Sequence, residues 1–430
     1  MSSKLPTTRS PSSPSLGLPT WGLVAVLAVL AVVKLSQGFD LLLLGGSEGA
    51  VDLRLRFDET RAWFSGFWIR GAVYPPASQA LLWPAVGWLP FREARGLWAL
   101  LSLGCLAWLS WLCARECGLR SAAGRIACAL LPLAASATSS AVGIGQIVPL
   151  FLPVVATAVL CMARGPSRWA DSAGAALLFT IASVKPTLFA PFAWLVLLLP
   201  RSRRPAALAA ALYLVLTLVA LAAIFKLGKH PSLAAAFRSE LSNKTRWATT
   251  VSPLDGNKRT LFGGGYGNLQ NMSQEAGLVG LQNFVLPVAS VLACGAWLLR
   301  HRRTDPWILL GVCALAARLG WYHRFYDDML LVFPVIALVR ISASSREPGG
   351  AASRTSRTAA VLLALTLAHL LAPGRIHLHM GALMDAAAAW IWLADLVFLA
   401  AVIPPFAAAG AGLEPARRPL LPCAVSAGAP

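Results

Sequence analysis

The sequence of 430 residues is 57% hydrophobic and only 13% charged, which excludes an ordinary soluble protein because soluble domains are about 25% charged. Its net charge of +19 would suggest nucleic-acid binding in a soluble chain, but the sequence has no RNA-binding motif and no compact basic domain. The basic residues instead fall in short loops between apolar runs, so the composition predicts an all-α polytopic membrane protein with no nucleic-acid partner.

Residues 1–20 are rich in proline and serine, which predicts a disordered tail before the first apolar run. A helix needs about 20 apolar residues to cross the hydrocarbon core of a bilayer. We expect about ten to twelve transmembrane helices within one domain at 21–406, followed by a second disordered tail at 407–430. The apolar segments are 21–41, 94–114, 126–143, 147–163, 173–184, 187–200, 205–227, 283–300, 306–320, 328–342, 358–373 and 386–406.

The distribution of arginine and lysine predicts the orientation of the chain. Short arginine-rich segments alternate with long loops at 42–93 and 228–282, and short basic segments favour the cytoplasmic side. We therefore expect a multi-pass protein of the plasma (inner) membrane, with both termini and the linker 344–357 in the cytoplasm. The two long loops and the segment 321–328 would then lie on the extracytoplasmic side.

The first outer loop concentrates acidic and basic residues. Asp52, Asp58 and Glu59 alternate with arginines, and the stretch 52–64 is predicted to be an amphipathic helix at the membrane interface. Asp52 and Asp58 are six residues apart, so they do not share one helical face. One carboxylate suffices as the general base that deprotonates a sugar hydroxyl. The alternative is that these acids only pair with the arginines at the level of the lipid headgroups.

Two further positions carry proline next to a polar or aromatic residue. Tyr74 is followed by two prolines, a rigid turn that is suited to the start of a membrane helix. Lys185-Pro186 interrupts the apolar stretch 173–200, which predicts either two short helices with an outer turn or one broken helix. A lysine within the membrane is a functional candidate, here for a lipid phosphate; the alternative is a lysine that extends to the interface from a turn.

The segment 321–328 reads WYHRFYDD and lies between two apolar runs. His323 and Arg324 are suited to binding phosphate oxygens. Tyr322 could stack on a sugar, or belong to the aromatic belt that many membrane proteins place at the interface.

Two uncharged residues are weaker candidates for binding sugar hydroxyls. Gln146 follows a glycine-containing turn, and Asn268 lies in the glycine-rich part of the second outer loop. The sequence shows neither a nucleotide-binding motif nor a set of metal ligands, so we expect no cofactor and no metal site.

In their order along the chain these motifs resemble glycosyltransferase family 87, multispanning GT-C enzymes that include polyprenol-phosphate-mannose-dependent α-mannosyltransferases. The resemblance covers roughly residues 50–340. The matching motifs are Asp52, Arg61-Ala62 and Gly66 in the first outer loop, Tyr74-Pro75-Pro76, Gly145-Gln146, Lys185-Pro186-Thr187, Gly267-Asn268, and Tyr322-His323-Arg324 with Tyr326-Asp327.

The resemblance implies a GT-C fold and transfer of a hexose, above all mannose, from a polyprenyl-phosphate donor to a glycolipid or glycan acceptor. The transfer would occur on the extracytoplasmic face, with inversion at the anomeric carbon. Two other functions stay open, a transporter or flippase of a lipid-linked sugar and a catalytically inactive partner in cell-envelope assembly. The residues assigned to the site are Asp52, or else Asp58, as the base; Lys185, His323 and Arg324 as cations for the lipid phosphate; Asp327 to orient His323; and Tyr322, Tyr74, Gln146 and Asn268 as further substrate-binding residues.

Overall fold

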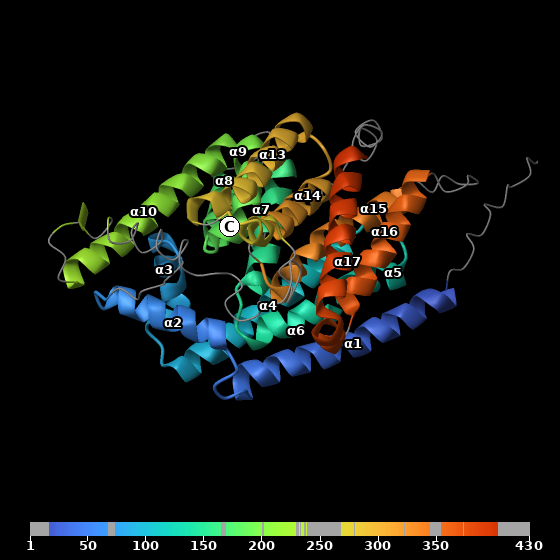
Figure 1. The fold of residues 1–430 in the computed structure, drawn as a ribbon. Coiled ribbons are helices and arrows are strands. Elements are labelled where there is room, and N and C mark those ends of the chain that lie inside the picture. The colour runs from blue at the N-terminus through green and yellow to red at the C-terminus, as the bar shows by residue number, and fades with distance from the viewer. Residues whose placement is uncertain are drawn as a thin grey trace, which may run out of the picture.

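The computed structural model describes the chain from residue 17 to residue 402 with several gaps. Within the described residues the chain is almost entirely helical and contains no strand, which confirms the expected all-α class (Figure 1). Tyr322, the tail 407–430 and most of the tail 1–20 lie outside the described residues. The gaps are 68–73, 165–168, 200–201, most of 229–267, 279, 322, 345–353 and 373.

The first half of the chain begins with a long apolar helix, α1 (Gly17–Leu44), which runs beneath the other helices in Figure 1. Its exposed face carries large apolar side chains, among them Val29 and Val32, as expected for a helix that contacts lipid rather than water. The elements that follow are α2 (Val51–Phe64), α3 (Pro76–Leu82), the π-helical turn η1 (Trp83–Gly87), α4 (Phe91–Glu116), α5 (Ala122–Ala134), α6 (Ser136–Gly143), α7 (Val148–Arg164), α8 (Trp169–Ala182), α9 (Pro186–Leu198) and α10 (Arg203–Leu227).

The second half packs around α14 (Pro306–Gly320), which is the most enclosed helix of the bundle. Nearly every residue of α14 from Trp307 to Ala317 is buried, and the helix contacts α9, α13, α15 and α17. Its apolar side chains therefore form the centre of the hydrophobic core. The other elements of this half are α12 (Leu269–Glu275), η3 (Gly280–Phe284), α13 (Val285–His301), η4 (Phe325–Leu331), α15 (Val332–Ser344), α16 (Arg354–Leu371) and α17 (Gly374–Ala401).

Among the described residues, four helices are long and apolar enough to cross a membrane, namely α1, α4, α10 and the helix that contains α13. The pair α5 and α6 passes the same test together but bends by 45°, and five further apolar helices are shorter. The prediction of a multi-pass membrane protein is therefore confirmed. The predicted number of about ten to twelve transmembrane helices is reached only if the shorter apolar helices are counted as well.

The prolines that the sequence marks do begin helices. The stretch 173–200 forms two short helices, and α9 starts at Pro186 directly after Lys185, because proline at the first helical position gives up no hydrogen bond. Pro76 likewise starts α3. This helix has only 7 residues, however, and the long helix α4 begins at Phe91. Tyr74-Pro75-Pro76 is therefore the entry turn of a helix, as predicted, but this helix is short, and a π-helical turn lies between it and the long apolar helix α4.

Candidate active site

The start of α2 is fixed to the connection between α6 and α7. The amide of Asp52 donates to the carbonyl oxygen of Ile144 at 2.9 Å, and the amide of Ala50 donates to that of Gly143 at 2.9 Å. These bonds satisfy amides of the first helical turn, which have no partner within their own helix. The start of α2 is thereby held against the connection between α6 and α7.

Gly145 allows this close approach. Its φ is +74°, a left-handed conformation that glycine adopts without strain. A Cβ at this position would lie 2.5 Å from the Cβ of Leu53. Because such atoms do not approach so closely, a larger residue here would push α2 away from the α6–α7 connection.

Asp52 and Gln146 come together although they are 94 residues apart in the sequence, because the amide nitrogen of Gln146 donates to Oδ2 of Asp52. Gln146 is buried, and Asp52 is half-buried. This hydrogen bond fixes the direction of the Asp52 carboxylate. It uses Oδ2 and not Oδ1. Asp58 is exposed, and no hydrogen bond among the described residues joins it to this connection. The predicted difference in direction between the two aspartates is confirmed.

A second polar cluster forms around Asp327 in η4. The ammonium nitrogen of Lys185 lies 3.0 Å from Oδ1 of Asp327, and Nδ1 of His323 lies 2.9 Å from Oδ2. Asp327 and His323 are buried, and the side chain of Lys185 is only 12% exposed. Two of the predicted phosphate-binding cations thus share one carboxylate, and Asp327 contacts His323 as the sequence analysis expects.

The two partners of Asp327 decide its protonation. Burial alone would raise the pKa of its carboxyl group, but the positive charge of Lys185 and the hydrogen bonds from Lys185 and His323 outweigh burial and hold the pKa below its ordinary value. For His323 burial is the larger effect. It lowers the pKa of the imidazole, and Asp327 offsets the change only in part. The site at neutral pH therefore contains an ionised Asp327 and a neutral His323.

The neutral imidazole has a defined tautomer. The carboxylate of Asp327 can only accept, so Nδ1 of His323 carries the proton and Nε2 has a free lone pair. Nε2 is buried and has no hydrogen-bond partner among the described residues. A buried nitrogen of this kind is suited to a proton or to a ligand that supplies one.

Tyr74 connects the two clusters. Burial raises the pKa of its hydroxyl group; the charges of Arg56 and Lys185 oppose this rise, and those of Asp52 and Asp327 add to it. The guanidinium of Arg56 also lies over the tyrosine ring, 4.2 Å from its centre. The carboxylate of Asp52 and the charged groups of the second cluster therefore lie near the same buried side chain. The helix α6, which precedes Gln146, also contacts η4, which carries Asp327. The two clusters are thus neighbours, and we treat them as one candidate site.

Comparison with known proteins agrees with this arrangement. The sequence model of glycosyltransferase family 87 matches residues 72–334, which is more than half of the chain. The chain belongs to glycosyltransferase family 87. It is accordingly a membrane glycosyltransferase, an enzyme that works in a lipid bilayer on a glycan or lipid-linked substrate. No curated protein and no solved structure matches the chain.

The region that matches family 87 contains Tyr74, Lys185, His323 and Asp327 and begins after Asp52. Transfer of a glycosyl group requires a group that removes the proton of the acceptor hydroxyl and groups that stabilise the leaving group. The arrangement offers a half-buried carboxylate for the first task and a lysine with an imidazole for the second. Both lie at one end of the bundle, around the tyrosine.

Sequence reasoning missed a second buried charge pair in this glycosyltransferase. Nε of Arg318, near the end of α14, lies 2.5 Å from Oδ1 of Asp328, and Nε2 of His369 lies 3.4 Å from Oδ2. The side chain of Arg318 is 0% exposed, and its guanidinium lies 4.3 Å from the ring centre of Trp392. An arginine inside an otherwise apolar run was the signal that could have found it.

Consecutive aspartates thus face different partners. Asp327 meets the cations of the candidate site, whereas Asp328 meets Arg318 and His369 in the core. Among the C-terminal helices, the hydroxyl of Thr366 donates to Oδ2 of Asp395 at 2.7 Å and joins α16 to α17. The segment η4 is therefore held between the site and the C-terminal helices.

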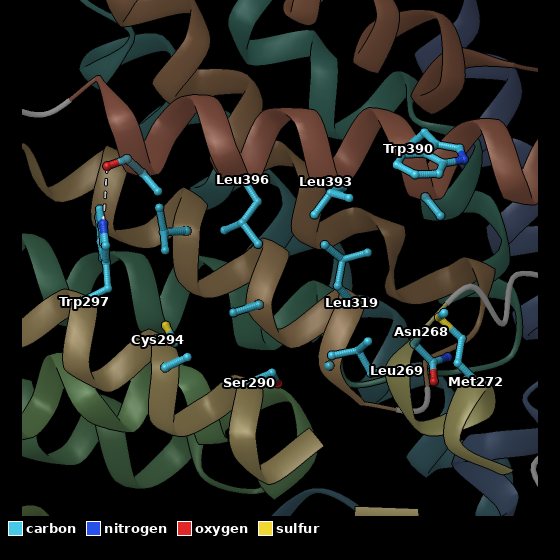
Figure 2. A pocket seen from close by; sticks show the side chains of 16 residues that line it. Asn268, Leu269, Met272, Ser290, Cys294, Trp297, Leu319, Trp390, Leu393 and Leu396 are labelled. Carbon is cyan, nitrogen blue, oxygen red and sulfur yellow. Dashed lines mark hydrogen bonds between the residues drawn. The ribbon is translucent and has the colours of Figure 1, made fainter. Parts of the chain in front are cut away.

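Two predicted substrate-binding residues lie outside these contacts. Arg324 is exposed, next to His323 in sequence. Asn268 is buried beside α12 and lines an apolar cavity between α13, α14 and α17 (Figure 2). The structure does not describe Tyr322, so its predicted role stays a prediction.

Proposed function

We propose that this enzyme transfers a hexose, by family resemblance mannose, from a polyprenyl-phosphate donor to a glycolipid or glycan acceptor. The transfer takes place on the extracytoplasmic face of the plasma membrane. It proceeds by direct displacement with inversion at the anomeric carbon. Asp52 acts as the general base, and Lys185 with His323 faces the phosphate of the donor.

The observation that carries this proposal is the pairing of Lys185 and His323 with Asp327, next to the carboxylate of Asp52 that Gln146 holds in place. A base for the acceptor and cations for the leaving group must lie on either side of one reacting carbon. Asp52 is tied to Gln146 on one side, and Lys185 is tied to Asp327 on the other. This geometry supports displacement between the two clusters.

The bonds change in one step. The acceptor hydroxyl loses its proton to the carboxylate of Asp52 as its oxygen attacks the anomeric carbon. The bond from this carbon to the phosphate oxygen breaks, and the lipid phosphate leaves with the electron pair. Lys185 offsets the growing charge. His323 takes up a proton from water at Nε2 as the anionic donor binds, since an adjacent negative charge favours the imidazolium form.

The test measures transfer of labelled hexose from polyprenyl-phosphate hexoses, mannose first, in membranes that contain equal amounts of wild type or variant. Asp52→Asn removes the base and should lower transfer at least about 100-fold. Asp58→Asn is the matched control, because Asp58 lies on the same helix but is exposed, and it should keep wild-type activity.

Other outcomes would contradict parts of the proposal. Equal transfer by wild type and Asp52→Asn would remove Asp52 as the base, and loss in Asp58→Asn alone would move that role to Asp58. Absence of transfer from every polyprenyl-phosphate sugar tested would refute the proposed donor. A transporter of lipid-linked sugars would then be tested by the protein's ability to move such a lipid between leaflets of a vesicle.

A further inference from the structure

An apolar cavity of about 460 Å³ lies between α13, α14 and α17 and is closed at one end by α12. Figure 2 shows it as a groove that follows the helices from Trp297 to Asn268 and Met272. Its lining residues on α17 run from Ala389 to Ala400, a distance of about 16 Å at about 1.5 Å per residue. The cavity is therefore elongated along the helices.

The polarity of the groove differs between its ends. None of the described residues that line it is charged, and its polar side chains, Asn268 and Ser290, lie toward the end of α14. A Cβ on Gly320 would lie 2.4 Å from the hydroxyl oxygen of Ser290, so Ser290 packs against the last residue of α14. His323, whose Nε2 is buried without a partner among the described residues, follows three residues later.

The groove also opens sideways. Trp390 is 69% exposed and Leu393 41% exposed, although both line it. Large apolar side chains remain exposed in this way where a membrane protein contacts lipid. A hydrocarbon chain could therefore pass from the bilayer into the groove without crossing a polar surface.

We propose that this groove binds the polyprenyl chain of the donor, with its phosphate end beside Gly320 and its isoprene units between α13 and α17. The inference rests on the proposed function. The donor is favoured over the acceptor because the groove reaches Gly320, the last residue of α14. His323 follows Gly320 by only three residues and shares the carboxylate of Asp327 with Lys185. An elongated apolar cavity with a phosphate-binding group at one end matches the amphipathic shape of a polyprenyl phosphate.

Neighbouring positions on α13 provide the test. Ala293 lines the groove, whereas Leu292 is 56% exposed and does not. Ala293→Trp would fill part of the groove, and Leu292→Trp would place the same side chain toward the bilayer. Both positions are exposed, so neither substitution disturbs the buried core.

The first measurement is binding, independent of sugar transfer. A polyprenyl phosphate that carries a photoreactive diazirine within its first isoprene units is irradiated with the protein in vesicles of unlabelled phospholipid, and labelled peptides are identified by mass spectrometry. We expect labels on α13, α14 and α17, reduced about tenfold by Ala293→Trp and unchanged by Leu292→Trp. A tenfold loss corresponds to about 1.4 kcal/mol, roughly two buried methylene groups. Labels elsewhere, or equal labelling of both variants, would overturn the proposal.

The second measurement is transfer from donors of different chain length. Ala293→Trp should raise KM for a long polyprenyl donor about tenfold and leave unaffected a donor with a methyl group in place of the polyprenyl chain, because that donor does not enter the groove. If wild type transfers sugar but Ala293→Trp affects neither donor, the groove is refuted and the proposed function stands. If wild type transfers from no donor while labelling still maps to the groove, the proposed function fails and the groove remains a polyprenyl-phosphate site.

Discussion

Replacing Asp328 with leucine would remove the carboxylate that balances the positive charge of Arg318 in the core. The guanidinium is 0% exposed and its Nε lies 2.5 Å from the carboxylate that the substitution removes. Loss of one partner of a buried ion pair costs about 3–5 kcal/mol. The interaction of Arg318 with the Trp392 ring at 4.3 Å contributes about 2 kcal/mol when desolvated. It is already present in the wild type, so it does not replace the lost carboxylate.

Thermal unfolding of the purified protein in detergent would measure this cost. At about 2.1 cal/mol/K per residue, the 430 residues give an unfolding entropy of about 0.9 kcal/mol/K. Asp328→Leu should therefore lower Tm by about 3–5 °C. The double variant Arg318→Met with Asp328→Leu removes both charges and should return Tm to within about 2 °C of the wild type, because apolar replacement of a buried pair is close to neutral.

Two results would refute this reasoning. A Tm of Asp328→Leu within 1 °C of wild type would mean that water or another group compensates Arg318, contrary to its complete burial. A double variant as unstable as the single variant would mean that the pair contributes packing rather than charge compensation. Asp58→Asn, at an exposed position of α2, serves as the control and should leave Tm unchanged.

Three further predictions concern the site and its side of the membrane. Burial lowers the pKa of His323, and the donor phosphate requires the imidazolium form, so kcat/KM for the donor should fall as pH rises above that pKa. His323→Gln should remove this fall in kcat/KM, and a wild-type profile that rises with pH would contradict the prediction. Gly145→Ala should cost about 1–3 kcal/mol in stability and reduce transfer, because φ is +74° there and the added Cβ would lie 2.5 Å from that of Leu53. Gly104→Ala, where the added Cβ meets open space, should change neither stability nor transfer. Equal Tm values for the two variants would contradict the close approach of α2 to Gly145. Asp58→Cys should react with a membrane-impermeant maleimide in intact cells above the background of the wild type, and reaction only after lysis would place the first loop in the cytoplasm.

The sequence predicts those features that depend on neighbouring residues. Pro186 ends the continuity of the apolar stretch at Lys185, because the effect of a proline on a helix acts within one turn. The helix predicted over 52–64 is found as α2, Val51–Phe64. The family resemblance likewise depends on short motifs in order. The structure and the family match confirm the all-α class, these helices and membership of glycosyltransferase family 87.

The contacts that assemble the site could not be predicted in the same way. The bond between Gln146 and Asp52 joins residues 94 apart, and that between Lys185 and Asp327 joins residues 142 apart. Such pairs follow from how the helices pack, and one sequence does not encode packing in a readable pattern. Arg318 was overlooked for another reason. Its partner Asp328 stands beside Asp327 in the sequence, so the two carboxylates read as one acidic cluster rather than as two separate pairs.

The position of Asp328 also bears on where the chain can be shortened. The match to the family ends at residue 334, yet His369, which contacts Asp328 of η4, lies beyond it on α16. The bond between Thr366 and Asp395 in turn joins α16 to α17. A shortened protein that stops after α15 would expose the guanidinium of Arg318 where Trp392 now covers it. It would also remove one wall of the apolar groove. Expression of the enzyme for structural work therefore requires the helices through Ala401, even though they lie outside the region that defines the family.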